Sequence, residues 1–264
     1  MRIQLQCWSK TIFTINITRP RQQVWAVFVY IYIVHIKSYW IMGVVWITGA
    51  SRGIGFATAQ KFLSEGWKVV VLTRDIEKLD GLKKAYPDHL HACKVDLMNL
   101  GDVQLPNYPV DILINNAGAL VNKPLSEVSL ADLHKSYGVN VFGPYLLIQK
   151  LLPQFSEKAH IVNISSVGGI QGSVKFAGLS AYSSAKGAIN VLTECLQTEF
   201  EQSTHWSFNA LALGAIQTEM LNEAFPGLQA PLKPEQLSPF IYAFATSAHH
   251  VMRGKVVPVS MSTP

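Results

Sequence analysis

The chain has 264 residues, of which 49% are hydrophobic and 15% are charged, so it is long enough and apolar enough for one globular α/β domain. Its net charge of +5 at pH 7 comes from the first 41 residues, which contain five basic residues and no acidic one. The remaining chain has 17 basic and 17 acidic residues, which gives no electrostatic reason to expect nucleic-acid binding. Cys7, Cys93 and Cys195 follow no metal-ligand or disulfide spacing, so we expect no metal site and a reducing, cytoplasmic location.

Residues 1–41 differ in composition from the rest and are interpreted as an extension that precedes a single domain at 42–264. The stretch 24–42 is apolar and about as long as a membrane span of roughly 20 residues, although it contains His35 and Lys37. It could be translated sequence upstream of a natural start at Met42, a membrane anchor, or an added strand or arm. The first interpretation is favoured because a strand that opens the domain follows Met42, and a membrane is an expected partner only if 24–42 is an anchor. No small-residue cleavage site of a signal peptide follows the stretch.

After Met42, short apolar and β-branched runs alternate with segments of helical periodicity. Strands are predicted at 43–47, 68–72, 91–95, 112–115, 159–164, 206–211 and 255–259. Helices are predicted at 56–65, 76–85, 130–152 and 181–200. This alternation predicts an α/β, Rossmann-type, doubly wound and mostly parallel seven-stranded sheet with helices on both faces. Residues 97–110, between the third and fourth strands, leave room for at most a short helix.

The segment Thr48–Gly55 follows the first strand and opens the first helix, which is the context of a dinucleotide-binding turn. Gly49 would permit the tight turn, Gly53 the close approach of a cofactor, and Gly55 the packing of helix on strand. The backbone N–H groups at the start of the helix suit a pyrophosphate. The glycine spacing differs from G-x-G-x-x-G, and an ordinary glycine-rich turn is the alternative.

The end of the second strand bears on which nicotinamide cofactor is used. An NAD enzyme usually has a carboxylate there, which binds the ribose hydroxyls, whereas this chain has Thr73 followed by Arg74. Arg52 lies in the glycine loop, and two guanidinium groups near the adenine ribose would favour a 2′-phosphate. Asp75 weakens the argument, and either arginine could be a solvated surface residue. The sequence predicts NADPH as the preferred cofactor, with NADH less favoured.

Tyr182 and Lys186 lie four residues apart at the start of the helix at 181–200, so their side chains project from one helical face. A tyrosine that donates a proton to a carbonyl oxygen needs a pKa below its usual value of about 10. A nearby ammonium lowers this pKa because it favours the phenolate. Alone the pair is a weak signal, because Y-x-x-x-K often arises by chance on an exposed helix.

Polar residues at three other places give the pair a context. Ser165 and Ser166 end the fifth strand, where a hydroxyl could stabilise charge on a substrate oxygen or cap the following turn. Residues 115–118 end the fourth strand with small side chains, against which a cofactor could lie or which could form a simple turn. Asn140 falls inside the helix predicted at 130–152, where asparagine is a poor helix former and a buried amide needs partners.

These motifs together resemble those of the classical short-chain dehydrogenases/reductases. The matching set is Thr48-Gly-Ala-Ser-Arg-Gly-Ile-Gly55, Asn115-Asn-Ala-Gly118, Asn140, Ser166, Tyr182 and Lys186. The resemblance covers about residues 42–264. Motifs in this order, each at the right element boundary, are more specific than any one of them alone.

The resemblance implies a role for each matching residue. Tyr182 would be the general acid/base, and Lys186 would lower its pKa and bind the nicotinamide ribose. Ser166, rather than Ser165, would orient the substrate oxygen, and Asn140 would hold a water in a proton relay. The implied cofactor-binding residues are Gly49, Ser51, Arg52, Gly53, Ile54, Gly55, Arg74, Asp96, Leu97, Asn116, Ala117, Gly118, Tyr182, Lys186, Ile216 and Thr218.

The chain departs from the family pattern at two places. Leu213 precedes Gly214 where the family usually has a proline, and Ser166 and Tyr182 are 16 residues apart, a few more than usual. The extra residues fall in 172–179, which would border the substrate, as would the loop at 219–237.

The predicted function is NADPH-dependent reduction of a small-molecule carbonyl to an alcohol, or the reverse, by hydride transfer. The glycine loop is most similar to that of bacterial 3-oxoacyl-acyl-carrier-protein reductases, so a 3-oxoacyl thioester is a candidate substrate. The alternative is a catalytically silent NADP(H)-binding redox sensor, which Leu213 and the longer 166–182 segment favour. A homodimer or homotetramer is expected, because the helices at 130–152 and 181–200 are the family's usual interface.

Overall fold

The structure is a computed structural model that describes residues 2–6, 12–16 and 42–261. Its chain divides into two compact units, 1–41 and 42–264. In the first unit, β1 (Arg2–Gln6) pairs antiparallel with β2 (Ile12–Asn16). The apolar stretch interpreted above lies, apart from Met42, outside the described residues. Among the described helices, none has the length and apolar character needed to cross a membrane.

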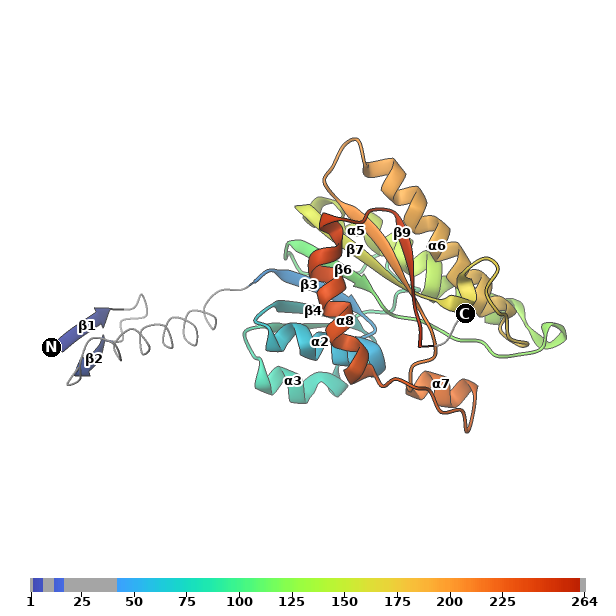
Figure 1. The fold of residues 1–264 in the computed structure, drawn as a ribbon, viewed down its shortest axis with the longest axis horizontal. Helices are drawn as coiled ribbons and strands as arrows, with labels where there is room; N and C mark the ends of the chain where they lie inside the picture. Colours follow the sequence, from blue (N-terminus) through green and yellow to red (C-terminus); the bar gives the residue numbers. More distant parts are fainter. Residues whose placement is uncertain (1, 7–11, 17–41, 262–264) are drawn as a thin grey trace. The chain divides into compact units, whose positions relative to one another are not determined.

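The second unit is built on a seven-stranded sheet in which every neighbouring pair is parallel (Figure 1). The strands are β3 (Val44–Thr48), β4 (Lys68–Thr73), β5 (Leu90–Lys94), β6 (Val110–Asn115), β7 (Phe155–Ser166), β8 (Ser207–Leu213) and β9 (Lys255–Val259). Their order is β5-β4-β3-β6-β7-β8-β9. The chain therefore winds outward from β3 in one direction and then restarts at β6 in the other, so the predicted doubly wound Rossmann-type fold is confirmed.

Helices cover both faces of this sheet, because alternate residues of each strand point to opposite faces. Val45 and Ile47 of β3 share an apolar core with residues of α2, α3 and α8, whereas Val44 and Trp46 share a second core with residues of α5 and α6. The helices are α2 (Gly53–Ser64), α3 (Asp80–Ala85), α4 (Leu130–Tyr137), α5 (Gly143–Leu151), α6 (Ser180–Phe200), α7 (Glu219–Ala224) and α8 (Pro234–Ser247).

Two predicted helices are less regular than expected. The helix predicted at 130–152 is divided into α4 and α5 by a π-helical turn, Gly138–Phe142, that contains Asn140. The helix predicted at 76–85 begins with a 3₁₀ turn, Glu77–Leu79, before α3. The π-helical turn matters for the site, because such turns re-aim side chains and often lie at functional positions.

The turn after β3 and the turn after β6 touch closely at the point where the sheet changes winding direction. Gly49 has a φ of +68°, a conformation that glycine adopts without the cost a Cβ would bring. A Cβ at Gly49 would lie only 2.7 Å from Cα of Ala117. Glycine is therefore required at this position both for its backbone conformation and for the space it leaves.

A second close contact joins the end of β7 to α6. The short turn Val167–Gly169 follows β7, and a Cβ on Gly169 would lie 2.7 Å from the backbone oxygen of Lys186 in α6. Ser166 and Lys186 therefore belong to two backbone segments that are held in direct contact.

Gly169→Ala is expected to destabilise the fold by about 1–3 kcal/mol, because its methyl group would overpack the contact with the α6 backbone. Gly81→Ala is the matched control: no atom lies within 4 Å of a Cβ at Gly81, which lies in α3, so its effect is expected to be neutral or slightly stabilising. Urea denaturation of both variants measures the difference. Equal stability of the two variants would show that the β7 turn and α6 can separate at no cost.

Candidate active site

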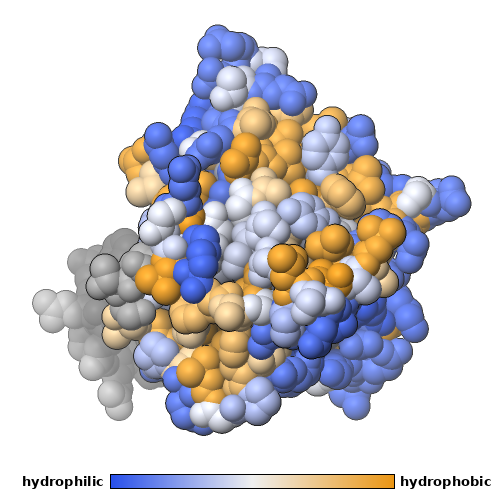
Figure 2. Space-filling view, turned by 90° about the vertical axis from the view of Figure 1, so that its right-hand side faces the viewer, coloured by the Kyte–Doolittle hydropathy of each residue, from blue (hydrophilic) through white to orange (hydrophobic). Residues whose placement is uncertain are grey.

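The sequence-predicted site residues collect at the carboxyl edge of the sheet, on both sides of the change in winding direction between β3 and β6. Ligands of open parallel sheets bind at this edge. Figure 2 shows the face that includes this edge, where hydrophobic side chains gather in patches between polar ones. The loops after β3, β6, β7 and β8 supply the residues described below.

Lys186 is held beside Tyr182 by the strand underneath it. Its ammonium lies 5.7 Å from the centre of the Tyr182 ring and donates a hydrogen bond of 2.8 Å to the carbonyl oxygen of Ile164 in β7. The side chain is 4% exposed, and this burial lowers the pKa of Lys186 to about 8. One helix and one strand therefore fix a cation whose charge has little contact with water.

Tyr182 in α6 and Ser166 at the end of β7 lie near enough for the serine hydroxyl to favour the phenolate. Burial raises the pKa of Tyr182 to about 12, and the Ser166 hydroxyl opposes that increase. This direction is opposite to the lowered pKa that the sequence led us to expect from Lys186, because the loss of solvent around the phenol outweighs its favourable interactions.

The two serines at the end of β7 point to different partners. Ser165 is buried and donates a 3.0 Å hydrogen bond to the backbone oxygen of Lys186. Ser166 accepts a 3.2 Å hydrogen bond from the N–H of Gly168, so it caps the turn as well as contacting Tyr182. The hydroxyl beside the phenol therefore belongs to Ser166, as the family resemblance implies.

Asn140 is buried in the π-helical turn and holds the loop after β6. Its amide donates 2.7 Å and 2.8 Å hydrogen bonds to the backbone oxygens of Ser136 and Ala119, and its Oδ1 accepts one of 3.3 Å from the N–H of Ala119. A Cβ on Gly118 would lie 3.2 Å from this Oδ1 and 3.7 Å from the Lys186 ammonium. The loop after β6, Asn140 and Lys186 thus meet around the bare backbone of Gly118.

The Thr48 side chain, for which the motif alone indicates no role, connects the two turns at the centre of the sheet. Its hydroxyl accepts 3.0 Å hydrogen bonds from the N–H groups of Asn116 and Ala117. The Asn116 amide donates in return to the backbone oxygens of Thr48 and Gly49, at 2.9 Å and 3.1 Å. Asn116 therefore holds the glycine loop in place. A Cβ at Gly55 would clash with the Asn116 amide nitrogen.

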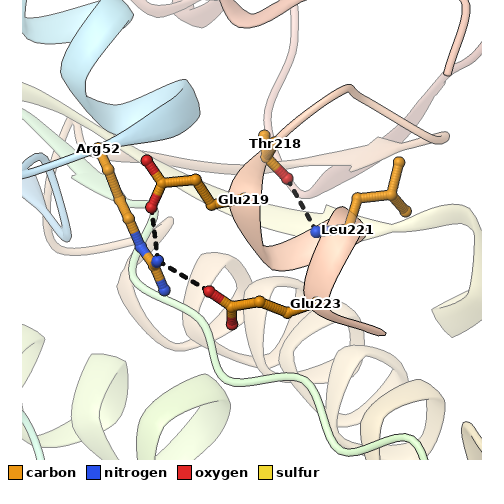
Figure 3. A network of polar contacts seen from close by, with 5 residues as sticks. All are labelled: Arg52, Thr218, Glu219, Leu221 and Glu223. Carbon is orange, nitrogen blue, oxygen red and sulfur yellow. Dashed lines mark hydrogen bonds and ion pairs between the residues drawn. The ribbon is translucent and has the colours of Figure 1, made fainter. Parts of the chain in front are cut away.

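Arg52 is engaged in a way that the sequence did not indicate. Its Nη1 forms ion pairs of 2.6 Å with Glu219 and 3.1 Å with Glu223, both in α7 (Figure 3). The arginine holds the pKa of Glu219 below its usual value. Two carboxylates more than 160 residues away in sequence therefore contact the guanidinium that the sequence predicts to bind a phosphate.

Arg74 differs from Arg52 in its surroundings. It is exposed just beyond the end of β4 and forms no ion pair within the part of the chain that the structure describes. Thr73 is buried and accepts a 3.3 Å hydrogen bond from the N–H of Asp75. Of the two predicted arginines, only Arg74 therefore has an uncommitted guanidinium.

The remaining predicted cofactor residues lie along the same edge. Asp96 follows β5 and accepts a 3.0 Å hydrogen bond from the N–H of Met98, while its neighbour Leu97 is buried. Ile216 is buried and bridged to Leu232. Ser51 and Ile54 are half-buried at the start of α2.

Thr218 caps α7 by accepting a 3.2 Å hydrogen bond from the N–H of Leu221 (Figure 3). A Cβ on Gly53 would lie 3.5 Å from the Thr218 methyl group, so the start of α7 covers the start of α2.

Leu213, which replaces the family's usual proline, is buried in β8, and the N–H of Gly214 bonds to the oxygen of Val259 at 2.9 Å. β9 thus supports the backbone at this departure from the family pattern.

An open cavity of about 800 Å³ lies behind the turn that follows Ser166. Its lining includes Gly168, Phe176, Ser183 and Val191, but neither Tyr182 nor Lys186. The cavity is therefore bordered by sequence neighbours of the tyrosine and lysine rather than by these two side chains themselves.

Comparison with known proteins agrees with this geometry. The family model described as short chain dehydrogenase matches residues 43–229. The chain belongs to the short chain dehydrogenase family. Membership places it among the NAD(P)-dependent oxidoreductases.

Curated relatives in this family differ in their substrates. The chain is 32% identical over 201 residues to the mouse protein named Dehydrogenase/reductase SDR family member 7B, covering 70% of this chain and 61% of the mouse protein. It is 30% identical over 213 residues to L-xylo-3-hexulose reductase of Hypocrea jecorina, covering 68% of each. The chain thus spans less than two thirds of the length of the mouse relative.

Solved structures similar to this chain include complexes with either nicotinamide cofactor. The 3-ketoacyl-(acyl-carrier-protein) reductase of Brucella melitensis complexed with NADH has a TM-score of 0.72 and 26% identity, covering 83% of this chain and 97% of that one. A putative short chain dehydrogenase of Escherichia coli CFT073 complexed with NADPH also has a TM-score of 0.72 and 26% identity, covering 84% and 98%.

Lys186→Met is expected to alter the pH dependence of stability. Folding lowers the pKa of Lys186 from 10.5 to about 8, so the unfolded chain binds more protons between these values. The stability of the natural chain relative to the variant therefore rises with pH through this window, by about 2 kcal/mol from pH 8 to pH 10, and is lost as the pH falls through 8. Urea denaturation of both proteins at several pH values measures this difference.

Lys83→Met is the control for this experiment, because it removes the same charge from a residue that is exposed in α3. A difference between the natural chain and Lys186→Met that stays constant from pH 8 to pH 10 would contradict the burial of a charged Lys186.

Proposed function

We propose that the chain is an NADP(H)-dependent oxidoreductase that interconverts a small-molecule carbonyl and its alcohol, with Tyr182 as the proton donor and acceptor. The observation that carries this proposal is the buried Lys186 ammonium, which the Ile164 carbonyl holds beside the Tyr182 ring, with Ser166 near enough to the phenol to favour its charged form. Of these groups, the Lys186 ammonium lies 3.7 Å from the position of a Cβ on Gly118, at the edge of the sheet where a dinucleotide would bind.

The glycine loop fits a dinucleotide cofactor. In the described part of the chain, no side chain caps the N-terminus of α2, and its first turn contains no acidic residue. Its N–H groups are therefore free to bind a pyrophosphate, which the positive end of the helix dipole also favours. Gly53, Ala117 and Gly118 would leave the space that the cofactor needs, while Gly49, Gly55 and Asn116 hold the shape of the loop around it. Asp96 and Leu97 lie farther along the same edge. The bound nicotinamide would supply or accept the hydride.

The protein's own residues would manage the proton. In the direction of reduction, the Tyr182 phenol donates its proton to the substrate oxygen while the carbonyl carbon gains a hydride, so the product is a neutral alcohol. Ser166 hydrogen-bonds the same oxygen as its charge develops. Lys186 then stabilises the resulting phenolate, because a neighbouring ammonium favours the charged form of tyrosine. Asn140 would hold a water that returns a proton to this pair.

The preference for NADPH is part of the proposal. Arg74 lies at the end of β4, and the position before it is Thr73 rather than a carboxylate. A guanidinium there is suited to a 2′-phosphate, and a carboxylate for the ribose hydroxyls is missing from that position. A 3-oxoacyl thioester is one candidate substrate, which the likeness to the Brucella reductase supports.

We also propose self-association through α4, α5 and α6. These helices expose several large apolar side chains, namely Leu130, Leu133, Tyr145, Leu146 and Val191. Burying such side chains in a symmetric contact between two copies is the common way in which an apolar helix face is covered. A homodimer or a homotetramer would both satisfy this requirement.

Tyr182→Phe is expected to lower the rate of carbonyl reduction by about 10²–10⁴-fold, because it removes the proton donor and leaves the ring in place. The measurement is NADPH oxidation across ketones, aldehydes and 3-oxoacyl thioesters. Tyr86→Phe is the control, since Tyr86 lies at the end of α3, outside both the site and helices α4, α5 and α6. Full activity of Tyr182→Phe would refute the assigned chemistry, and cofactor binding by the natural chain without any oxidation would favour a redox sensor.

Arg74→Gln is expected to raise the KM for NADPH about tenfold, the effect of losing roughly 1.4 kcal/mol from a charge-assisted contact, and to leave the KM for NADH unchanged. Steady-state kinetics with each cofactor make the comparison. Similar KM values for NADH and NADPH in the natural chain would contradict the proposed preference.

A further inference from the structure

Helix α7 is fastened at both ends to loops that belong to the proposed cofactor site. At the glycine loop, Arg52 pairs with Glu219 and Glu223 (Figure 3). At the other end, the Asn122 amide donates a 2.8 Å hydrogen bond to the backbone oxygen of Ala224, the last residue of α7. The loop after β6, which contains Asn122, and the loop after β3 are thereby joined through a six-residue helix.

The charges in this contact do not balance. One guanidinium faces two carboxylates, whose side chains are 60% and 66% exposed, so the cluster has a net charge of −1. Lys78, in the turn that follows β4, also lowers the pKa of Glu219 by charge attraction. Glu219 therefore contacts the glycine loop at Arg52, at the end of the site where an adenine ribose would be bound under the proposed function.

A 2′-phosphate and these carboxylates need the same cation. Both ion pairs use Nη1 of Arg52. A phosphate that bound another edge of the same guanidinium would lie within a few ångströms of two negative charges, which is unfavourable even where solvent screens them. A phosphate dianion also forms stronger bidentate hydrogen bonds with arginine than a single carboxylate oxygen does.

We propose that Glu219 and Glu223 are specificity-determining residues that compete with the cofactor's 2′-phosphate for Arg52. This inference rests on the proposed function, because it assumes that the glycine loop binds a nicotinamide dinucleotide. A cofactor with a 2′-phosphate displaces the two carboxylates and releases α7 from the glycine loop. A cofactor without it leaves the Arg52 contact with α7 in place.

Release of α7 would also displace Thr218 and Met220, the two residues that flank Glu219 in sequence. Thr218, which caps α7, lies 3.5 Å from the position of a Cβ on Gly53. Met220, in the first turn of α7, lies 3.9 Å from the position of a Cβ on Gly118. Movement of α7 therefore changes the cover over both the pyrophosphate end and the nicotinamide end of the proposed cofactor groove.

The test compares two nucleotides that differ only in the 2′-phosphate, 2′,5′-ADP and 5′-ADP, so it needs neither a substrate nor turnover. Calorimetry on the full chain gives the Kd of each for the natural protein and for Glu219→Gln/Glu223→Gln. The double variant is expected to bind 2′,5′-ADP at least about tenfold more tightly and to bind 5′-ADP within twofold of the natural chain. Adding Arg52→Gln to the double variant should remove this gain in affinity for 2′,5′-ADP.

Glu199→Gln/Glu201→Gln is the matched control. It removes the same charge from exposed residues at the end of α6, which precedes β8 and so lies at the opposite edge of the sheet. It should leave both Kd values unchanged. An unchanged ratio of the two Kd values in Glu219→Gln/Glu223→Gln would overturn the proposal, as would an equal gain in the control, which would indicate a general effect of net charge.

Hydrogen exchange of residues 219–224 provides a second readout that a purely structural ion pair would not move. In the natural chain, 2′,5′-ADP is expected to accelerate exchange in α7, whereas 5′-ADP should not. In the double variant, exchange should already be fast without nucleotide. Protection of α7 by 2′,5′-ADP would overturn the proposal. A chain that oxidises no NADPH on any carbonyl would refute the proposed activity and leave these binding results valid.

Discussion

The structure depends on the close contact between the turns that follow β3 and β6. The chain winds in opposite directions from these two neighbouring strands, and it is at such a point, outside the carboxyl ends of the strands, that an open parallel sheet forms the groove for its ligand. Gly49 lies against Ala117, and the Thr48 hydroxyl accepts hydrogen bonds from two N–H groups of the opposite turn. With these two turns fixed, the N-terminus of α2 and the backbone of Gly118 face the same space.

The reacting groups are held from the other side of this groove, and burial is both their advantage and their cost. The carbonyl of Ile164 and the backbone contact at Gly169 fix Lys186 and Ser166 relative to each other. Burial lowers the pKa of Lys186 to about 8 and raises that of Tyr182 to about 12, so at pH 7 the lysine is still mostly an ammonium and the tyrosine is a neutral phenol. A phenol that keeps its proton at neutral pH is suited to donating it, and a nearby ammonium is most useful once that proton has gone.

The charged groups at the glycine loop and α7 differ from the buried pair, because they remain in contact with water. Arg52, Glu219 and Glu223 are largely exposed, and exposed ion pairs contribute little to stability. An ion pair that is weak, and that a phosphate can replace, is better suited to discriminating between cofactors than to stabilising the fold. This explains why an arginine of the glycine loop can pair with α7 and still belong to a cofactor site.

Local sequence predicted the fold and the order of the site residues well. Strands β3, β4 and β6 are short runs rich in β-branched residues and buried almost throughout, and such runs are visible without knowledge of their neighbours. The prediction of one continuous helix at 130–152 was wrong. The Asn140 amide donates hydrogen bonds to the backbone oxygens of Ser136 and of Ala119, which lies in a distant loop, and the helix is interrupted at this point. The length of the longer strand, β7, was also underestimated, since its first residues are partly exposed and not apolar in pattern.

By itself, the sequence determined the alternation of strands and helices, the glycine turn and the pairing of Tyr182 with Lys186 on one helical face, because these features depend on residues that are close in the chain. Only the tertiary structure decided which serine contacts the phenol, that burial raises rather than lowers the pKa of Tyr182, and that Arg52 is already paired. Each of these depends on desolvation or on charges brought together from distant segments, and neither can be read from residue spacing.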